Sequence, residues 1–395
     1  MLENATPILQ KLAYGQTLET DEVIMALDTI SDEDTIPDKE NSNGFYFLAL
    51  TFGIMAKGPT AGELLGFVES IKNRSIKLET TLAPSRIIDI SGTGGDLIKT
   101  INVGTISSFV LAAGGLNVAK QATRGYTGYT GSADLYTQIG LNPFSVDSNL
   151  AVKSLEQTGL SAFYTPGLTD KFKNRMDFLV KLKTIGLSYP TPWHLISWVY
   201  SPFTMENRIY GVFDPKYAGT MTRLFEKLGY RRVLVIHGMD GLDEFSNVGE
   251  TFVSELKDGE IREYMVTPAD FGLEQSPVEA ILTLTKEEKA KLDHPMTPSV
   301  EKDALKEEGR LRNIRAFFEI LHGVETGPLR DLVMMNCGAA FYIAGKAASY
   351  REGTAMAREI LESGKAAAKL NELITFAGAA EKVAETLQKL GIGKW

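Results

Sequence analysis

Three glycines and an aspartate in the first third of the chain have the types and the spacing to bind an anion. They form the stretch Gly92-Thr93-Gly94-Gly95-Asp96, with an apolar segment at residues 86–90 before it and another at residues 105–116 after it. The first segment predicts a buried strand and the second a helix. Glycines in a strand-to-helix turn let backbone N–H groups approach a phosphate with no Cβ in the way. An ordinary tight turn would also use glycines, and neither G-x-G-x-x-G nor the Gly-Lys-Ser/Thr ending of a P-loop is present here.

A second stretch, residues 120–134, combines glycines and hydroxyl side chains with two cations. Lys120 and Arg124 carry positive charge, and Thr123 and Thr127 lie close to them in the sequence. Charged donors and hydroxyls in one loop can surround a phosphate group. A solvated loop would have the same composition, so this stretch alone leaves both interpretations open.

A third stretch, residues 233–244, runs from an apolar segment into a loop that carries acids, and Asp243 and Glu244 are adjacent at its end. Two neighbouring carboxylates can hold Mg2+ together with waters and the phosphates of a substrate. The alternative is structural, because acids at the start of a helix interact favourably with its dipole.

The other reactive side chains predict no site of their own. Cys337 lies in an apolar run that predicts a buried helix, and the G-x-S-x-G motif of a nucleophile elbow does not occur in the sequence. The histidines lack the spacing of zinc ligands; they are His194, His237, His294 and His322. We therefore assign no catalytic residue from the sequence.

The elements that must position these stretches change character near residue 80. Residues 1–78 have apolar residues at helical spacing and predict a small helical domain, in which Thr60 and Glu63 have the spacing of a capping box. A helical segment near residues 168–195 is expected to return to this domain. Residues 79–395 predict an α/β domain with a central, mostly parallel sheet, which binds ligands beyond the carboxyl ends of its strands. The candidate strands are residues 86–90, 117–120, 161–164, 209–213, 232–236 and 251–256.

The composition narrows the class of protein. The 395 residues include 44% hydrophobic and 23% charged residues, and the net charge is −9, as in an ordinary soluble globular protein. The acidic balance argues against nucleic acid as a partner. The single cysteine suits a reducing compartment, Met1-Leu2-Glu3-Asn4 lacks the pattern of a signal peptide, and no apolar run is long enough to span a bilayer. We therefore expect a cytoplasmic protein without membrane contact.

Together, these stretches resemble the anthranilate phosphoribosyltransferase family, which shares its fold with the pyrimidine and thymidine nucleoside phosphorylases. The resemblance extends over nearly the whole chain. The matching motifs, in chain order, are Gly92-Thr93-Gly94-Gly95-Asp96, Asn102-Val103-Gly104-Thr105, Gly131-Ser132-Ala133-Asp134, Gly211-Val212-Phe213-Asp214-Pro215, His237-Gly238, Gly241-Leu242-Asp243-Glu244, residues 267–273, Gly327-Pro328-Leu329-Arg330-Asp331 and the run that begins at Asn336.

The resemblance implies a fold, a reaction and a set of contacts. The fold would be a small helical domain and a larger α/β domain with a cleft between them, usually a homodimer through the small domain. The reaction, in the family a step of tryptophan biosynthesis, would use Mg2+ and move the phosphoribosyl group of phosphoribosyl pyrophosphate to an aromatic or heterocyclic nitrogen. Asp243 and Glu244 would bind the metal. Donor contacts would come from Gly92, Thr93, Gly94, Gly95, Asp96, Asn102, Thr105, Lys120 and Thr127.

The acceptor side departs from the family pattern. Where the family has K-H-G-N-R, this chain has Lys120-Gln121-Ala122-Thr123-Arg124, and the serine of the family's N-x-S-T is Gly104. The family's arginine for the anthranilate carboxylate falls in residues 178–183, where this chain has no arginine. The candidates for acceptor contacts are Thr123, Arg124 and Lys181, although a lysine does not supply the bidentate fork of an arginine. We therefore expect an acceptor other than anthranilate.

Two other functions remain possible for this sequence. A nucleoside phosphorylase-like enzyme would use free phosphate in place of pyrophosphate, and the adjacent acids Asp243 and Glu244 argue against it. A non-catalytic relative would keep the scaffold as a ligand-binding protein, and the altered residues Gln121, Thr123 and Gly104 keep that alternative open.

Overall fold

A computed structural model describes residues 5–28, 42–73, 75–123, 130–165 and 189–393. The chain divides into two compact units, and each is described by itself. The small unit comprises Met1–Leu78, Thr165–Pro202 and Gly219–Gly229. The large unit comprises Glu79–Tyr164, Phe203–Ala218 and Tyr230–Trp395.

The small unit is helical in its described residues and has an aromatic core. Trp193 is fully buried, its ring centroid lying 5.2 Å from that of Phe67 and 6.1 Å from that of Phe47. Its helices are α1 (Ala5–Ala13), α2 (Thr20–Asp28), α3 (Ser42–Lys57), α4 (Ala61–Lys72), α9 (Pro192–Ile196) and most of α10 (Ala218–Lys227). Tyr14, Phe45 and Phe52 are exposed on this unit. The homodimer contact expected there stays a prediction.

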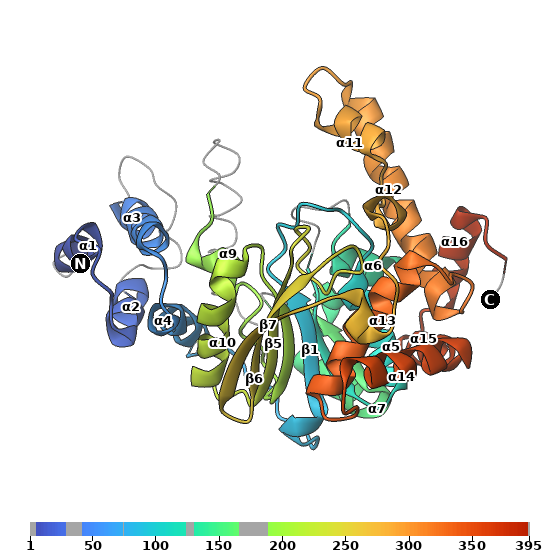
Figure 1. Ribbon diagram of the computed structural model, residues 1–395, viewed down its shortest axis with the longest axis horizontal. Coiled ribbons are helices and arrows are strands. Elements are labelled where there is room, and N and C mark those ends of the chain that lie inside the picture. The colour runs from blue at the N-terminus through green and yellow to red at the C-terminus, as the bar shows by residue number, and fades with distance from the viewer. Residues whose placement is uncertain (1–4, 29–41, 74, 124–129, 166–188, 394–395) are drawn as a thin grey trace. The chain divides into compact units, whose positions relative to one another are not determined.

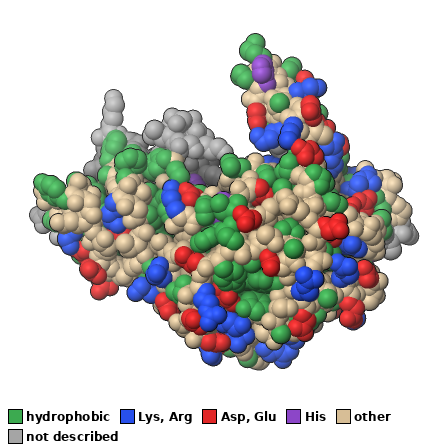
Figure 2. Space-filling model, viewed as in Figure 1, with side chains coloured by type: hydrophobic (Ala, Val, Ile, Leu, Met, Phe, Trp, Pro, Cys, Tyr) green, Lys and Arg blue, Asp and Glu red, His purple; other side chains and the backbone are tan. Residues whose placement is uncertain are grey.

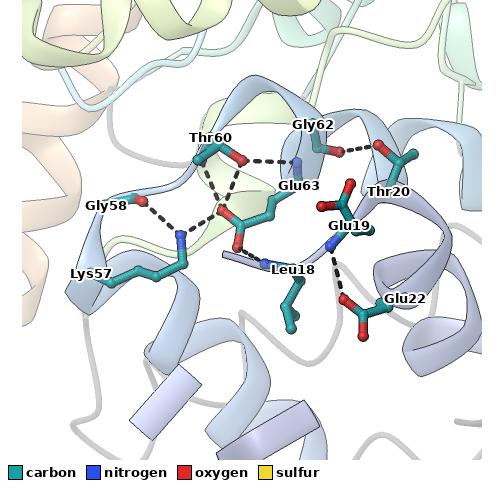
Figure 3. A network of polar contacts seen from close by, with 9 residues as sticks. All are labelled: Leu18, Glu19, Thr20, Glu22, Lys57, Gly58, Thr60, Gly62 and Glu63. Atoms are coloured by element: carbon teal, nitrogen blue, oxygen red, sulfur yellow. Dashed lines mark hydrogen bonds and ion pairs between the residues drawn. The ribbon is translucent and has the colours of Figure 1, made fainter. Parts of the chain in front are cut away.

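The predicted capping box of α4 is confirmed and forms the centre of a buried polar network (Figure 3). The carboxylate of Glu63, with no exposed surface, accepts hydrogen bonds from the backbone N–H of Thr60 at 2.9 Å and of Leu18 at 3.0 Å. It also pairs with the ammonium of Lys57 at 2.7 Å. One acid therefore joins the start of α4 to the segment before α2 and to the end of α3.

Replacing Glu63 with alanine is expected to lower the free energy of unfolding of the small unit by about 3 kcal/mol, because it leaves two N–H groups unpaired and removes the carboxylate partner of Lys57, whose ammonium then keeps only the carbonyl of Gly58. Chemical denaturation followed by tryptophan fluorescence measures this, since Trp193 lies in the same core. Glu69 on α4, whose partner Lys72 is exposed, provides the control, and Glu69→Ala should change stability by less than about 1 kcal/mol. Equal effects of the two variants would contradict the central role of Glu63.

The large unit contains a seven-stranded sheet among its described residues, in the order β3-β2-β1-β4-β5-β6-β7. The pairs from β3 to β5 are parallel, and β5–β6 and β6–β7 are antiparallel. The predicted fold class, α/β with a mostly parallel sheet, is thus confirmed. The strands are β1 (Ile87–Gly92), β2 (Asn117–Gln121), β3 (Leu160–Phe163), β4 (Asn207–Gly211), β5 (Arg232–Gly238), β6 (Thr251–Lys257) and β7 (Glu260–Val266).

Strand β7 was not among the candidate strands, and several predicted boundaries differ by one or two residues. Most side chains of β7 are exposed or half-exposed, and three of its first four residues are charged. A strand at an antiparallel edge lacks the apolar run that marks the buried parallel strands. Strand β4 begins and ends two residues earlier than predicted, and helix α5 (Val103–Ala113) begins two residues earlier.

Helices α5, α13, α14 and α15 lie beside one another and build the main core of the large unit (Figure 1). Helix α11 and the first turns of α12 instead project from the rest of this unit, and their surface mixes basic and acidic side chains (Figures 1 and 2). The last turns of α12 are buried in the core. The bounds are α6 (Ser132–Gln138), α7 (Ser148–Thr158), α11 (Lys286–Asp293), α12 (Ser299–Leu321), α13 (Pro328–Ile343), α14 (Tyr350–Glu362), α15 (Lys365–Ala377) and α16 (Ala380–Leu390). Within the described ranges, we find no helix with the length and apolar character needed to cross a membrane.

Candidate active site

The Gly-rich turn lies at the carboxyl end of β1, as the sequence predicts. Gly94 and Gly95 have φ angles of +67° and +86°, a backbone conformation that favours glycine. Thr93 ties the turn to the end of β4, because its N–H donates to the carbonyl of Gly211 at 2.9 Å and its Oγ1 accepts from the N–H of Phe213 at 2.9 Å. The turn is therefore fixed in place by protein contacts.

The structure brings the acidic pair to this turn, although 149 residues separate the two in the chain. The N–H of Gly94 donates to Oδ2 of Asp243 at 2.8 Å. A Cβ on Gly92 would overlap this carboxylate, and a Cβ on Gly211 would overlap the carbonyl oxygen of Asp243 and lie 2.9 Å from its Cβ. Two glycines are thus needed for the close approach of Asp243. The N–H of Gly94 is engaged inside the protein, which differs from the expectation of a donor directed at a phosphate.

A closed turn after β5 presents the acids. The N–H of Gly238 donates to the carbonyl of Leu242 at 2.9 Å, and the N–H of Leu242 donates to Oδ1 of Asp240 at 3.2 Å. The hydroxyl of Ser246 donates to the other oxygen of Asp240. Asp240 therefore stabilises the turn, and Asp243 and Glu244 directly follow it in the chain.

Asp96 has a lysine partner that the sequence reasoning missed. Nζ of Lys99 lies 3.0 Å from Oδ1 of Asp96 and donates to its backbone carbonyl at 2.7 Å. Residues 96–99 are not helical, so no helical spacing rule indicated the pair. Lys99 thus supplies a positive charge beside the acids of this site.

The acidic pair carries strongly perturbed carboxyl groups. Burial, followed by the negative charge of Asp96, raises the pKa of Asp243 to about 6, against the opposing effect of the Gly94 N–H. Burial and the charges of Asp243 and Asp96 raise the pKa of Glu244 well above its usual range. The protein groups of the site therefore stabilise less negative charge than the ionised acids carry, as a cation-binding site would.

The start of α5 contributes unpaired polar atoms. Nδ2 of Asn102 and Oγ1 of Thr105 are buried and have no hydrogen-bond partner among the described residues. Asn102 is held through its backbone, because its N–H donates to Oδ1 of Asn313 on α12 at 2.8 Å. No sequence pattern indicated that contact, since Asn313 lies 211 residues further on in a long helix. Buried donors without partners at a helix start suit an anionic ligand.

Lys120 lies at the same edge of the sheet, near the end of β2. It is 5% exposed, its ammonium donates to the carbonyl of Gln121 at 3.3 Å, and burial lowers its pKa, opposed chiefly by the charge of Asp89. A Cβ on Gly104 would lie 3.8 Å from its Nζ. The predicted donor contacts Lys120, Asn102 and Thr105 are therefore grouped around the beginning of α5.

A buried ion pair, which the sequence reasoning also missed, joins β1 to β4. Asp89 and Arg208 are register partners with no exposed side-chain surface, and their charged groups lie 2.6 Å apart. Ser91 and Tyr230 complete the network, at 2.8 Å from Asp89 and 3.0 Å from Arg208. This network connects the two strands whose ends hold the Gly-rich turn.

The structure describes some of the remaining predicted residues and not others. Three lie outside them, and they are Arg124, Thr127 and Lys181. Thr123 is described, and its N–H donates to the hydroxyl oxygen of Ser132 at 2.9 Å. Nδ1 of His237 donates to the carbonyl of Val212 at 2.7 Å. Burial raises the pKa of Cys337 to about 12, which suits the predicted core position and leaves the thiol unreactive.

Comparison with known families gives the class of enzyme to which this fold belongs. Residues 84–297 and 290–367 match the family model described as "Glycosyl transferase family, a/b domain", which is more than half of the chain. The protein is accordingly a glycosyltransferase.

More specifically, the chain belongs to the anthranilate phosphoribosyltransferase family, as its motifs indicated. It is 31% identical over 373 residues to the anthranilate phosphoribosyltransferase of Rhodopseudomonas palustris, covering 94% of this chain and 98% of the relative. The structure of the Thermus thermophilus enzyme matches with a TM-score of 0.76 and 27% identity, over 94% and 99% of the two chains. That of the Saccharomyces cerevisiae enzyme in complex with PRPP and Mg matches with a TM-score of 0.75 and 21% identity, over 95% and 98%.

Proposed function

We propose that this phosphoribosyltransferase uses Mg2+ and phosphoribosyl pyrophosphate, and transfers the phosphoribosyl group to an aromatic or heterocyclic nitrogen with release of pyrophosphate. The observation that supports this most directly is the contact between Gly94 and Asp243. It places an acidic pair beside a Gly-rich turn, at the sheet edge where α5 begins with unpaired donors. A sugar diphosphate offers the matching chemistry, since its phosphates are anions that also bind a divalent cation.

The carboxylates available in the site fit a metal ion that is also coordinated by the substrate. No group of three or more histidine, cysteine, aspartate or glutamate side chains in the described part of the chain could hold a metal by itself. Mg2+ is commonly held by one or two carboxylates together with substrate phosphates and waters, and Asp243 and Glu244 supply two carboxylates. Bound Mg2+ would offset the negative charge that develops on the leaving pyrophosphate. The yeast relative, whose structure contains PRPP and Mg, supports the same assignment.

The protein's own groups would stabilise the donor before and during transfer. Asn102 and Thr105 have buried polar atoms free to bond to phosphate oxygens, and Lys120 supplies a buried amino group, whose protonated form a bound phosphate would favour. In the reaction the bond from ribose C1 to the pyrophosphate oxygen breaks, and the acceptor nitrogen forms the new bond to C1 with its lone pair. An acceptor nitrogen that carries a hydrogen then loses one proton, which the released pyrophosphate or water takes up. Hydrogen-bonding groups of the protein that are in place before the reaction stabilise the developing charge without having to move. An acceptor nitrogen that is correctly oriented toward C1 needs no strong general base.

The acceptor is proposed to differ from anthranilate, on the grounds of the residues that replace the family pattern. Thr123, Arg124 and Lys181 are the proposed acceptor contacts, in a chain where Gln121 and Gly104 also depart from that pattern. Relatives that bear the name anthranilate phosphoribosyltransferase make anthranilate the first compound to test.

The test has two parts. Calorimetry with phosphoribosyl pyrophosphate, with and without Mg2+, measures donor binding, and isotope-labelled donor with anthranilate and a panel of aromatic amines and N-heterocycles measures transfer. We expect donor binding that depends on Mg2+, and turnover of a panel member other than anthranilate. Absence of donor binding at millimolar concentration with Mg2+ would overturn the proposed activity, whereas turnover of anthranilate alone would overturn only the acceptor assignment.

Mg2+ binding is expected to weaken in acid. Because the pKa of Asp243 is raised to about 6 and that of Glu244 is also raised, protons compete with the metal for both carboxylates. The gain in pyrophosphate affinity on adding Mg2+ should fall at least about tenfold between pH of about 7 and about 5. Pyrophosphate itself gains protons in this range, so calorimetry of Mg2+ with pyrophosphate in the absence of protein, at the same pH values, provides the baseline. A gain that falls no more steeply with acid than the binding of Mg2+ to free pyrophosphate would contradict this assignment.

A further inference from the structure

A buried asparagine on α13 is bonded to the chain directly after the acidic pair. Asn336 is 1% exposed, and its Oδ1 accepts the N–H of Phe245 at 3.1 Å while its Nδ2 donates to the carbonyl of Phe245 at 3.1 Å. The same Nδ2 donates to the carbonyl of Leu332, one turn earlier in α13, at 2.9 Å. The amide thus pairs with both backbone groups of one residue and is itself tied to its own helix.

These contacts fix the peptide bond that follows Glu244. The N–H of Phe245 belongs to that peptide bond, so the direction of the Glu244 backbone depends on Asn336. On the other side, Asp243 is held by the N–H of Gly94 at 2.8 Å and lies against Gly211. The two acids are therefore fixed at both ends by groups far away in the sequence.

We infer that Asn336 is a positioning residue for the acidic pair, which keeps the carboxylates of Asp243 and Glu244 in the mutual arrangement that a divalent cation requires. This inference rests on the proposed function, because it assigns the pair to metal binding. All three hydrogen bonds of the Asn336 amide go to backbone groups of the protein, so its proposed action on the metal is indirect. A side chain that hydrogen-bonds both groups of one buried peptide segment leaves little freedom for the residue before it.

A purely structural role would give a different result. If Asn336 only connected α13 to the loop, its loss would lower stability and weaken every ligand contact of this sheet edge together. A positioning role predicts that the part of the affinity that depends on Mg2+ falls selectively. The affinity for inorganic pyrophosphate, measured by calorimetry with and without Mg2+, separates the two parts and needs no knowledge of the acceptor.

The test compares the full-length wild type with Asn336→Leu, which keeps the approximate size and removes all three hydrogen bonds. Asn336→Asp keeps the shape and the acceptor for the Phe245 N–H, and it provides the test if the leucine variant does not fold. Cys337→Ala is the matched control, because Cys337 is fully buried on the same helix but contacts the carbonyl of Ser107, at 3.9 Å.

We expect the Mg2+-dependent gain in pyrophosphate affinity to fall at least about tenfold in Asn336→Leu, and less in Asn336→Asp. The affinity of both variants without metal should change less than about threefold. The control Cys337→Ala should match the wild type. An unchanged gain, or an equal loss with and without metal, would overturn the positioning role alone. If the wild type itself gained no affinity from Mg2+, the metal assignment of the proposed function would fail first, and the role of Asn336 with it.

Discussion

Replacing Asp243 with asparagine and Glu244 with glutamine is expected to abolish Mg2+-dependent donor binding and, in the same protein without metal, to increase the free energy of unfolding. The loss follows from removing both proposed metal ligands. The gain follows from the raised pKa values, which show that the folded protein disfavours the ionised acids. Amides of the same shape carry no charge, and the amide carbonyl introduced in place of the Asp243 carboxylate would still accept the Gly94 N–H.

The sign and the size of the stability change follow from linkage. An acid whose folded-state pKa is raised favours folding at low pH, and this contribution is lost as the pH rises through the folded-state value, about 6 for Asp243. At pH of about 8 the wild type should therefore be less stable than the double variant by about 3 kcal/mol from Asp243 alone. Below pH of about 4 the difference in stability between the two proteins should vanish, because Asp243 of the wild type is then protonated in both the folded and the unfolded state.

The measurements are chemical denaturation without metal, at several pH values, and calorimetry with donor and Mg2+. Glu250→Gln is the control, since Glu250 is exposed on the same loop, and it should change stability by less than about 0.5 kcal/mol and leave donor binding unchanged. A double variant that still gains donor affinity from Mg2+ would remove the metal role of the pair. A variant that loses both stability and binding would indicate that the acids hold the loop together instead.

Local sequence patterns were sufficient to predict the parts of the site that consist of consecutive residues. The Gly-rich turn follows an apolar strand and precedes α5, and the acids Asp243 and Glu244 follow another apolar strand, so the rule for parallel sheets placed both at one edge. The capping box of Thr60 and Glu63 was equally local. These features depend on residues within a few positions of each other, where propensity and periodicity apply.

Contacts between distant segments could not be predicted from those patterns. The pairing of Asp89 with Arg208 depends on the register of β1 against β4, and the bond from Asn336 to Phe245 depends on how α13 packs. Neither leaves a periodic signal in the sequence. The exposed edge strand β7 was missed for a related reason, since its charged residues interrupt the apolar pattern that a strand search needs.

The glycines show this limit most clearly. The sequence suggests that the lack of a Cβ at Gly92, Gly94 and Gly95 admits a phosphate, whereas in the structure Gly92, together with Gly211, admits Asp243. The glycine pattern was therefore right about a close approach at this turn, and the approaching group is the protein's own acid. A glycine indicates that something lies close to the backbone, and only the tertiary structure identifies what it is.

Replacing Gly211 with alanine is accordingly expected to have a large effect, although the residue lies at the end of a strand and carries no functional group. The added Cβ would overlap the backbone carbonyl of Asp243 and lie 2.9 Å from its Cβ. Both are parts of the main chain or fixed to it, so no side-chain rotation relieves the overlap, and β4 must separate from the acidic loop. We expect the free energy of unfolding to fall by about 3 kcal/mol or more, and the Mg2+-dependent gain in pyrophosphate affinity to be lost.

Gly249→Ala provides the matched control for this prediction, because a Cβ at position 249 meets no atom within 4 Å. It should change stability by less than about 1 kcal/mol and leave the Mg2+ dependence unchanged. Denaturation and calorimetry of the two alanine variants, measured side by side, therefore separate the general effect of losing a glycine from the effect of displacing Asp243. If Gly211→Ala kept both its stability and its Mg2+ dependence, Asp243 would not lie against β4 in solution, and the link between the acidic pair and the Gly-rich turn would fail with it.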